Sequence, residues 1–307
     1  MPAFKFWEME QRNVLKGVIL VGLGASSYGM LATFVKLAYD KGYTTAEVTA
    51  SQMFLGILGM LLINMFQKAK KKDEVVKASA NDRSKLMIAG TSMGFTSVFY
   101  YLAVYFGIPV SICIVLLMQT VWMSVFLESI IAKEVPSAKK LFAVAIVLAG
   151  TVLAANLISN INALNITGVS FGLLAAASFT ATMFTSNTIA THVSSAQRSL
   201  FMLFGGGVVV LAFTAYTWTG SFNFEIFLTW GLILALFGTI IPPILLNAGF
   251  PHAGLGLGSI VASMELPVSV MMAFIVLQEK VSLLQWTGIA MILGAIVLMN
   301  VKLPSRK

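Results

Sequence analysis

Ten long apolar segments, separated by short polar stretches, follow one another along the chain. Their approximate ranges are 15–39, 46–66, 85–106, 108–131, 138–156, 167–190, 197–217, 226–248, 253–277 and 283–301. Each is close to the length of about 20 apolar residues that a helix needs to cross a bilayer. Turn-forming residues separate the segments, for example at 40–42 (DKG) and 160–162 (NIN). Because lipid offers no hydrogen-bond partners to an open strand, the pattern predicts an all-α polytopic membrane protein with ten transmembrane helices.

Composition supports a lipid environment. Apolar residues make up 58% of the chain and charged residues 10%, whereas soluble domains carry about 25% charged residues. The net charge of +8 would suit nucleic acid, but no basic stripe with interleaved aromatics is present, so we expect no nucleic-acid partner. The apolar stretch after residues 1–16 is too long for a signal peptide and is expected to stay as a first span.

The lysines and arginines predict the orientation. With the amino terminus inside and ten alternating spans, 17 of the 20 basic residues fall on the inner side, and seven of these lie in the segment 67–85. Only Lys36, Lys41 and Lys280 fall outside. Since basic residues concentrate in cytoplasmic loops, we expect both termini in the cytoplasm and the protein in the cell inner membrane.

The two halves of the chain match weakly, but in the same order. Met118 and Gln119 parallel Met264 and Glu265, and each pair is followed by an apolar span that ends in asparagine. The expected units are a first five-helix repeat, residues 1–157, and a second, residues 158–307. Because five is odd, the second repeat enters the membrane from the opposite side. Inverted repeats of this kind are typical of transporters, which bind their solute between the halves.

Five-helix halves, each with a glutamate just after its fourth span and a glycine-rich fifth span, resemble the drug/metabolite transporter superfamily, and within it the ten-helix EamA type. The resemblance is carried by Glu134, Glu279, Gly150, Gly294 and Pro267, the last within ELPVSVMMAFIVLQE. It covers nearly the whole chain. It implies a secondary carrier or exporter of amino acids, other metabolites or drugs that works without ATP. Where the family often has an arginine near the start of the second helix, this chain has Gln52.

Glu265 is the main candidate for binding a solute or a proton. It lies near the middle of the ninth apolar segment. A charged carboxylate at that depth costs at least about 2.5–3.5 kcal/mol, so the side chain should face a cavity or a partner. Such a carboxyl suits proton coupling or cation binding; the alternative is a hydrogen-bonded group that fixes helix packing. Pro267 removes a backbone donor two residues later and predicts a kink beside it.

A polar centre is predicted around Glu265. Gln119 is its expected counterpart in the first half, and Asn247 lies about one helical turn after Pro243. Pro242 and Pro243 are predicted to break the eighth span, which is tolerated best beside a cavity. Gln119, Asn247 and Glu265 are therefore expected to line one site, with interhelical contact as the alternative role for asparagine and glutamine.

Aromatic and charged residues complete the candidate set. Tyr28, Tyr100 and Trp122 lie deep in their spans and are suited to pack against an apolar or cationic solute, or only against other side chains. Lys36, near the outer end of the first span, either snorkels to the interface or meets an anionic group of the solute.

Three glutamates near helix ends are expected to have structural roles. Glu128 is expected to reach the membrane interface or to pair with Lys133. Glu134 and Glu279 lie at helix boundaries next to lysines, so they are expected to cap helices or form salt bridges.

No metal site and no cofactor are expected. Cys113 is the only cysteine, and His192 and His252 are isolated in loops. A membrane-embedded enzyme would need a nucleophile–base pair or a metal set within the spans, and aspartate and histidine are missing there. A sensor or scaffold would usually bring a soluble domain, and a channel would need a ring of equivalent charges.

The sequence therefore predicts a secondary transporter, expected to be an exporter, that works by alternating access and is either proton-linked or facilitative. Few permanent charges line the candidate site, so amino acids and similar metabolites are the leading substrates. Hydrophobic drugs are the alternative. The expected partners are a small-molecule solute, the lipid bilayer and protons, and a homodimer is left open.

Overall fold

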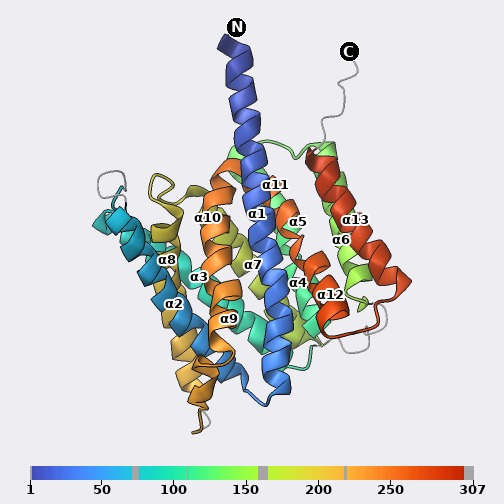
Figure 1. Ribbon diagram of the computed structural model, residues 1–307. Helices are drawn as coiled ribbons and strands as arrows, with labels where there is room; N and C mark the ends of the chain where they lie inside the picture. Colours follow the sequence, from blue (N-terminus) through green and yellow to red (C-terminus); the bar gives the residue numbers. More distant parts are fainter. Residues whose placement is uncertain (1, 71–75, 109, 158–164, 218–219, 301–307) are drawn as a thin grey trace.

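The structure is a bundle of helices (Figure 1). This computed structural model describes residues 2–70, 76–108, 110–157, 165–217 and 220–300, and no strand occurs among them. The predicted turn at 160–162 lies outside the described residues, as do Lys71, Lys72, Lys302, Arg306 and Lys307.

The helices follow the predicted segments. The first half contains α1 (Pro2–Asp40), α2 (Thr45–Lys70), α3 (Ala80–Tyr105), α4 (Val110–Leu117), α5 (Thr120–Ala132) and α6 (Ala138–Ala154). The second half contains α7 (Ile166–Thr188), α8 (Ser195–Tyr216), the 3-10 helix η2 (Phe224–Phe227), α9 (Gly231–Ala235), the π-helical segment η3 (Leu236–Ile240), α10 (Ile241–Ala253), α11 (Leu255–Ala262), α12 (Glu265–Val276) and α13 (Leu283–Asn300). In the described part of the chain, nine segments are long and apolar enough to span a membrane. With α6, which has 17 residues, they match the ten predicted spans of an all-α, multi-pass membrane protein.

α1 is longer than the predicted first span. It has 39 residues, which at about 1.5 Å per residue is nearly twice the thickness of a hydrocarbon core of about 30 Å. Its first turns project beyond the bundle (Figure 1). The Pro2 end of α1 and the Asn300 end of α13 lie at the same face, which we call the amino-terminal face, and the other end of the bundle is the opposite face.

The two repeats interlock helix by helix. α1 lies along α10, and its counterpart α7 lies along α3. α6 and α13, the last helices of the two halves, pack against each other, as do α5 and α11. Each half therefore buries its apolar helix faces against the other half, and the two repeats form one bundle.

Two spans are broken at equivalent positions. One break separates α4 from α5 at residues 118–119, and the other separates α11 from α12 at residues 263–264. The chain tightens in the same way at both: the Val121 amide donates to the Met118 carbonyl (3.1 Å), and the Leu266 amide to the Ser263 carbonyl (3.2 Å). Aligning the breaks pairs Thr120 with Glu265 and Gln119 with Met264, which corrects the predicted pairing of Gln119 with Glu265.

Pro267 explains the second break. It has no N–H to donate to the Ser263 carbonyl four residues back, so the α-helix cannot continue without interruption. The Leu266 amide satisfies that carbonyl instead, through a tighter turn. As a result, Glu265 is the first residue of α12 and lies well inside the bundle.

Glycines allow α3 and α8 to cross at very short range. A Cβ added to Gly90 would overlap the backbone carbonyl of Met202, and one added to Gly205 would overlap that of Met87. The obstacle in both cases is main chain, which cannot rotate away. This crossing joins the first repeat to the second, so its glycines fix how the two halves fit together.

We expect Gly205→Ala to destabilise the protein by about 1–3 kcal/mol, the usual cost of overpacking a tight contact. Gly294→Ala is the matched control, because a Cβ at Gly294 meets nothing within 4 Å and alanine is the better helix former. Thermal unfolding of both variants in detergent, followed by tryptophan fluorescence, makes the comparison. Equal midpoints for the two variants would show that the crossing is not tightly packed.

Candidate functional site

A cavity of about 350 Å³ lies between the two halves of the bundle. Its walls come from α1, α2, α3 and α4 of the first half and from α12 of the second. A smaller space of about 170 Å³, which also includes Glu265, extends it toward Phe179 of α7 and Leu203 of α8. The volume falls within the range of small-molecule sites, about 300–1,000 Å³.

The cavity opens toward the opposite face. It shares Tyr39, Thr49 and Ser97 with a wider space of about 480 Å³, which reaches Tyr43 and Thr44 in the turn between α1 and α2. The described walls of both spaces therefore run from the middle of the bundle to one end of it.

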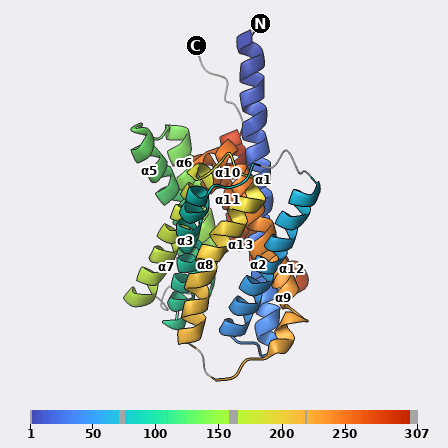
Figure 2. The ribbon, with the colours of Figure 1, turned by 90° about the vertical axis from the view of Figure 1, so that its left-hand side faces the viewer.

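Glu47 holds the rim of this opening together. Its carboxylate accepts hydrogen bonds from the Thr44 amide (2.7 Å) and from the Asn223 amide (2.6 Å). Asn223 precedes η2, which lies at the opposite face beyond the end of α8 (Figure 2). A buried carboxylate with these amide donors ties the α1–α2 turn of the first half to the second half.

Glu265 faces the cavity without a partner. It lines both the main cavity and its extension, and among the described residues no hydrogen bond or ion pair reaches its carboxylate. Gly29 of α1 packs directly against the backbone carbonyl of Glu265, where a Cβ would overlap it. This close approach brings α1 and its neighbouring side chain Tyr28 up to the carboxyl.

Tyr28 and Tyr100 line the same cavity as Glu265. Tyr28 comes from α1 and Tyr100 from α3, so the two rings reach the cavity from different helices. Tyr28 is held edge to face against Phe179, with ring centroids 6.4 Å apart. No hydrogen bond to either phenol occurs among the described residues, so both hydroxyls remain available to a bound molecule.

Several polar cavity residues were not identified as candidates from the sequence, and four of them lie on α2 and α3 beside the candidate residues. These four are Thr49, Gln52, Thr96 and Ser97. A signal for them was present: Thr49 and Gln52 are three residues apart, and Ser97 lies four residues before Tyr101. Residues three or four apart share one helix face, so a polar stripe inside an apolar span would have indicated a cavity wall.

No basic side chain lines the site. Lysine, arginine and histidine are absent from the described residues of the cavity and of its two extensions. Gln52 occupies the α2 wall, where the family resemblance led us to compare it with an arginine. Glu265 is the only acidic residue among the described lining residues, so the site carries a negative charge whenever this carboxyl is ionised.

Gln119 and Trp122 do not join this cavity. The Trp122 indole N–H donates to the Gln119 side-chain oxygen (3.0 Å), and the Gln119 amide donates to the Val115 carbonyl (3.1 Å). Trp122 is 36% exposed on the bundle surface and packs edge to face with Phe126. The predicted polar centre therefore lacks Gln119, because the break in the fourth span directs this residue to a local contact on its own helix pair.

Asn247 is also held elsewhere. Its side-chain amide donates to the Ser199 hydroxyl (3.0 Å), and its backbone carbonyl accepts a hydrogen bond from Arg198 (2.6 Å). It is buried between α8 and α10 and does not line the cavity with Glu265. The expectation that Gln119, Asn247 and Glu265 form one site is corrected on both counts.

Pro242 and Pro243 lie in the first turn of α10, which directly follows the π-helical segment η3. The span is therefore irregular where the sequence predicted a break. Gly238 and Thr239 of η3 lie on the cavity extension beside Gln52. The irregular backbone is thus next to a cavity, where freed carbonyls are best tolerated.

Lys36 pairs with Glu279, and both side chains are about half exposed. The pair joins α1 to the segment after α12 and lies outside the cavity walls. Salt bridging was one of the two roles expected for Glu279, besides helix capping. Lys36 was expected to reach the interface or an anionic solute, and its partner in the structure is Glu279.

Glu128 has a different partner from the one predicted. Its carboxylate accepts from the Lys140 ammonium (2.5 Å) and from the Gly256 amide (3.1 Å). Lys133 instead ends α5 in the left-handed conformation. Because the chain turns away there, Lys140 of α6 reaches Glu128 and links α5, α6 and the start of α11.

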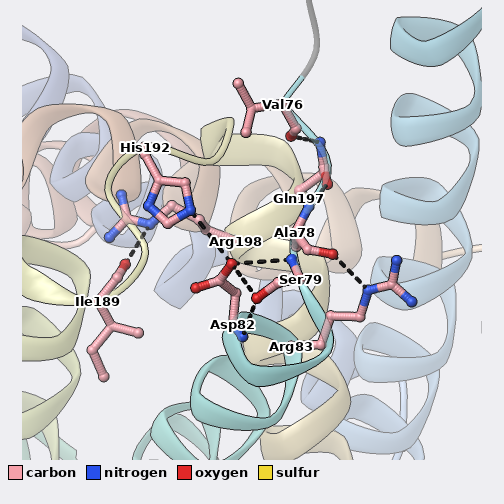
Figure 3. A network of polar contacts seen from close by, with 9 residues as sticks. All are labelled: Val76, Ala78, Ser79, Asp82, Arg83, Ile189, His192, Gln197 and Arg198. Atoms are coloured by element: carbon pink, nitrogen blue, oxygen red, sulfur yellow. Dashed lines mark hydrogen bonds and ion pairs between the residues drawn. The ribbon is translucent and has the colours of Figure 1, made fainter.

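Polar contacts between the halves close the amino-terminal face (Figure 3). Gln197 of α8 accepts from the Ala78 amide (3.1 Å) and donates to the Val76 carbonyl (3.0 Å). The His192 Nε2 lies 3.4 Å from a carboxylate oxygen of Asp82. These contacts hold the α7–α8 connection against the start of α3, at the end of the bundle away from the cavity mouth.

Arg198 is the residue that sequence reasoning most clearly misjudged. It is one of the 17 basic residues assigned to the inner side, yet its side chain is only 1% exposed. Its guanidinium donates to the carbonyls of Ile189 (3.0 Å), Ser186 (2.5 Å) and Asn247 (2.6 Å). Among the described residues it has no acidic partner, so the end of α7 and the carbonyl on α10 take the place of a counter-ion.

Comparisons with known proteins agree with this architecture. The sequence model of the EamA-like transporter family matches residues 15–156 and again residues 166–301. Among solved structures 28 chains match. One of them, described only as a crystal structure of a protein, is 13% identical, covers 94% of this chain and 96% of its own length, and has a TM-score of 0.72. No curated protein matches. At that identity the structural likeness shows the fold alone, and the family match spans both halves.

Proposed function

The chain belongs to the EamA-like transporter family, and from that premise we propose that it is a secondary carrier that moves a small organic metabolite across the bilayer by alternating access. The observation that carries the proposal is the cavity between the two repeats, open toward one face and closed at the other. Inverted repeats that rock about a central site produce this asymmetry in each of their two end states. No ATP is needed for such a cycle.

We propose that the amino-terminal face is cytoplasmic and that the membrane is the cell inner membrane. The described basic residues support this orientation. Arg83, Lys85, Lys139 and Lys140 lie at helix starts on the amino-terminal face, whereas Lys36, Lys41 and Lys280 are the basic residues on the other side. Since lysine and arginine concentrate in cytoplasmic segments, the cavity then opens to the outside.

We propose export of metabolites of amino-acid size, linked to proton movement through Glu265, with hydrophobic drugs as the second class of solute. The size of the cavity suits both classes. The unpaired carboxyl inside the bundle supports proton linkage, because ionisable groups at membrane depth commonly mark ion or proton pathways.

Transport itself is tested by counterflow. Proteoliposomes are preloaded with each of a panel of amino acids, the corresponding amines and aromatic drugs, and entry of the radiolabelled form is measured. We expect exchange of at least one class above the level of protein-free vesicles. A correctly folded protein that exchanges none of them would contradict the carrier function.

The direction of opening is tested by thiol labelling. In a Cys113→Ala background, Ser97→Cys should react with a membrane-impermeant maleimide added from outside, because Ser97 lines the open space. Ser84→Cys, exposed at the other end of the same helix, is the control and should react only from inside. Labelling of both from the same side would contradict the proposed orientation and opening.

A further inference from the structure

The charged and polar groups of the cavity point to one class of solute. Glu265 supplies a single carboxylate, and no lysine, arginine or histidine lines the cavity among the described residues. Uncompensated charge is costly in a low-dielectric site. A bound molecule that brought one positive charge would remove that cost, whereas a negative charge would add to it.

The hydroxyl groups on the cavity wall favour a ligand that donates hydrogen bonds. The Thr49 hydroxyl donates to the Thr45 carbonyl (2.7 Å), and the Thr96 hydroxyl donates to the Ser92 carbonyl (2.8 Å). The Ser97 hydroxyl is committed in the same way, to Met93 (3.3 Å). Each hydroxyl has only one proton, so these three oxygens can offer the cavity only lone pairs. Together with the Glu265 carboxylate they form a set of acceptors suited to the N–H groups of an ammonium.

Aromatic and aliphatic side chains complete the recognition. The rings of Tyr28 and Tyr100 line the same cavity as Glu265, and the face of an aromatic ring attracts a cation. The remaining wall includes Leu31, Val35 and Ile114, which suit an apolar body. The donors left for a carboxylate on the ligand are all neutral: the Gln52 amide and the hydroxyls of Thr45, Ser269 and the tyrosines.

We propose that the solute is an organic amine, bound as a monovalent ammonium with an apolar or aromatic body and without a carboxylate of its own. This narrows the metabolite class of the proposed function and rests on that function only in taking the cavity as the solute site. An amino acid is disfavoured because its carboxylate would share the cavity with Glu265 and find no cation there. The ammonium of the amine instead pairs with Glu265.

The test uses four probes that share a phenyl ring and differ in charge: phenethylamine, phenylalanine, hydrocinnamate and phenethyl alcohol. Their dissociation constants for the full-length protein in detergent are measured by titration calorimetry. We expect phenethylamine to bind at least about tenfold more tightly than each of the other three, the usual effect of a charge-assisted hydrogen bond. Equal or tighter binding of phenylalanine, or no binding of phenethylamine, would overturn the proposal.

Two variants separate charge recognition from folding. Glu265→Gln should weaken phenethylamine about tenfold or more while leaving phenethyl alcohol unchanged, which an unfolded protein could not do. Glu134→Gln removes a carboxylate exposed outside the cavity and should change neither. An amine preference that survives in Glu265→Gln would refute the role of this carboxylate. Binding of phenethylamine without counterflow of any solute would refute the carrier function and leave the ligand class standing.

Discussion

Glu265→Gln is expected to abolish the ability of a pH gradient to concentrate the carried solute in proteoliposomes. With one proton exchanged per solute molecule, a gradient of about one pH unit supports about a tenfold solute gradient in the wild-type protein. Glutamine keeps the size and hydrogen-bonding capacity of the side chain but cannot take up or release a proton. The accumulation ratio in the variant should therefore fall to about one.

The structure gives a reason to assign the coupling to this carboxyl. Glu265 starts α12 inside the bundle and lines the cavity, and its carboxylate has no partner among the described residues. Glu47 and Glu128 are instead held by amide or lysine donors at the two ends of the bundle. A group committed to such contacts is poorly placed to exchange protons with the cavity in each cycle.

The measurement is steady-state accumulation of radiolabelled solute, with and without an imposed pH gradient. Glu134→Gln, exposed at the end of α5, is the control and should accumulate solute like the wild type. If Glu265→Gln also accumulates solute about tenfold, the proton is carried elsewhere and the coupling role fails. Because the same variant is expected to bind an amine about tenfold more weakly, the solute is supplied above its dissociation constant for the variant, and the amine specificity is read separately from binding.

The helical spans could be predicted because lipid leaves the backbone few alternatives. Every span had to be a helix, and the apolar length fixed where each one lay to within several residues. Pro267 also predicted the second break, because a missing backbone N–H disturbs the helix at the proline itself. The first break, at residues 118–119, is not caused by a proline, so the sequence did not predict it and only the structure shows it.

The site was harder to predict because it depends on how each helix is rotated. Tyr28, Tyr100 and Glu265 share the cavity, but Gln119 and Asn247 face other neighbours. Successive residues of an α-helix are rotated by about 100° about the helix axis. An error of one residue in aligning the two repeats therefore paired Gln119 wrongly with Glu265 and placed it on the wrong helix face. The sequence indicates how deep a residue lies along its span. That depth does not show whether the side chain faces a cavity or packs against another helix.

Arg198 could not be recognised for a related reason. Its place at the very start of the seventh predicted span made it look like a charge at the membrane surface. The carbonyls that it binds come from α7 and α10, and only the packed bundle brings them together. One of them, that of Asn247, lacks its helical donor because Pro251 stands four residues later. The sequence of α10 therefore indicates that one buried carbonyl needs a donor from outside its own helix. It does not indicate which residue supplies that donor.

Arg198→Leu is therefore expected to cause the largest loss of stability of any substitution considered. It would leave the carbonyls of Ser186, Ile189 and Asn247 without their side-chain donor, and each buried unsatisfied group costs about 1–3 kcal/mol. The total should be on the order of 3 kcal/mol or more. Thermal unfolding in detergent should show a midpoint well below that of the wild type.

Arg83→Leu is the matched control. Arg83 is exposed at the same face, donates to one carbonyl, that of Ala78, at 3.1 Å, and lies 5.6 Å from the ring of Phe201, so its removal should cost less than about 1 kcal/mol. Arg198→Lys should fall between the two, because one ammonium cannot reach three carbonyls from the fork geometry of a guanidinium. Equal unfolding temperatures for Arg198→Leu and Arg83→Leu would contradict this prediction. Water would then have to satisfy the three carbonyls, and α7 would stay packed against α10 without the arginine.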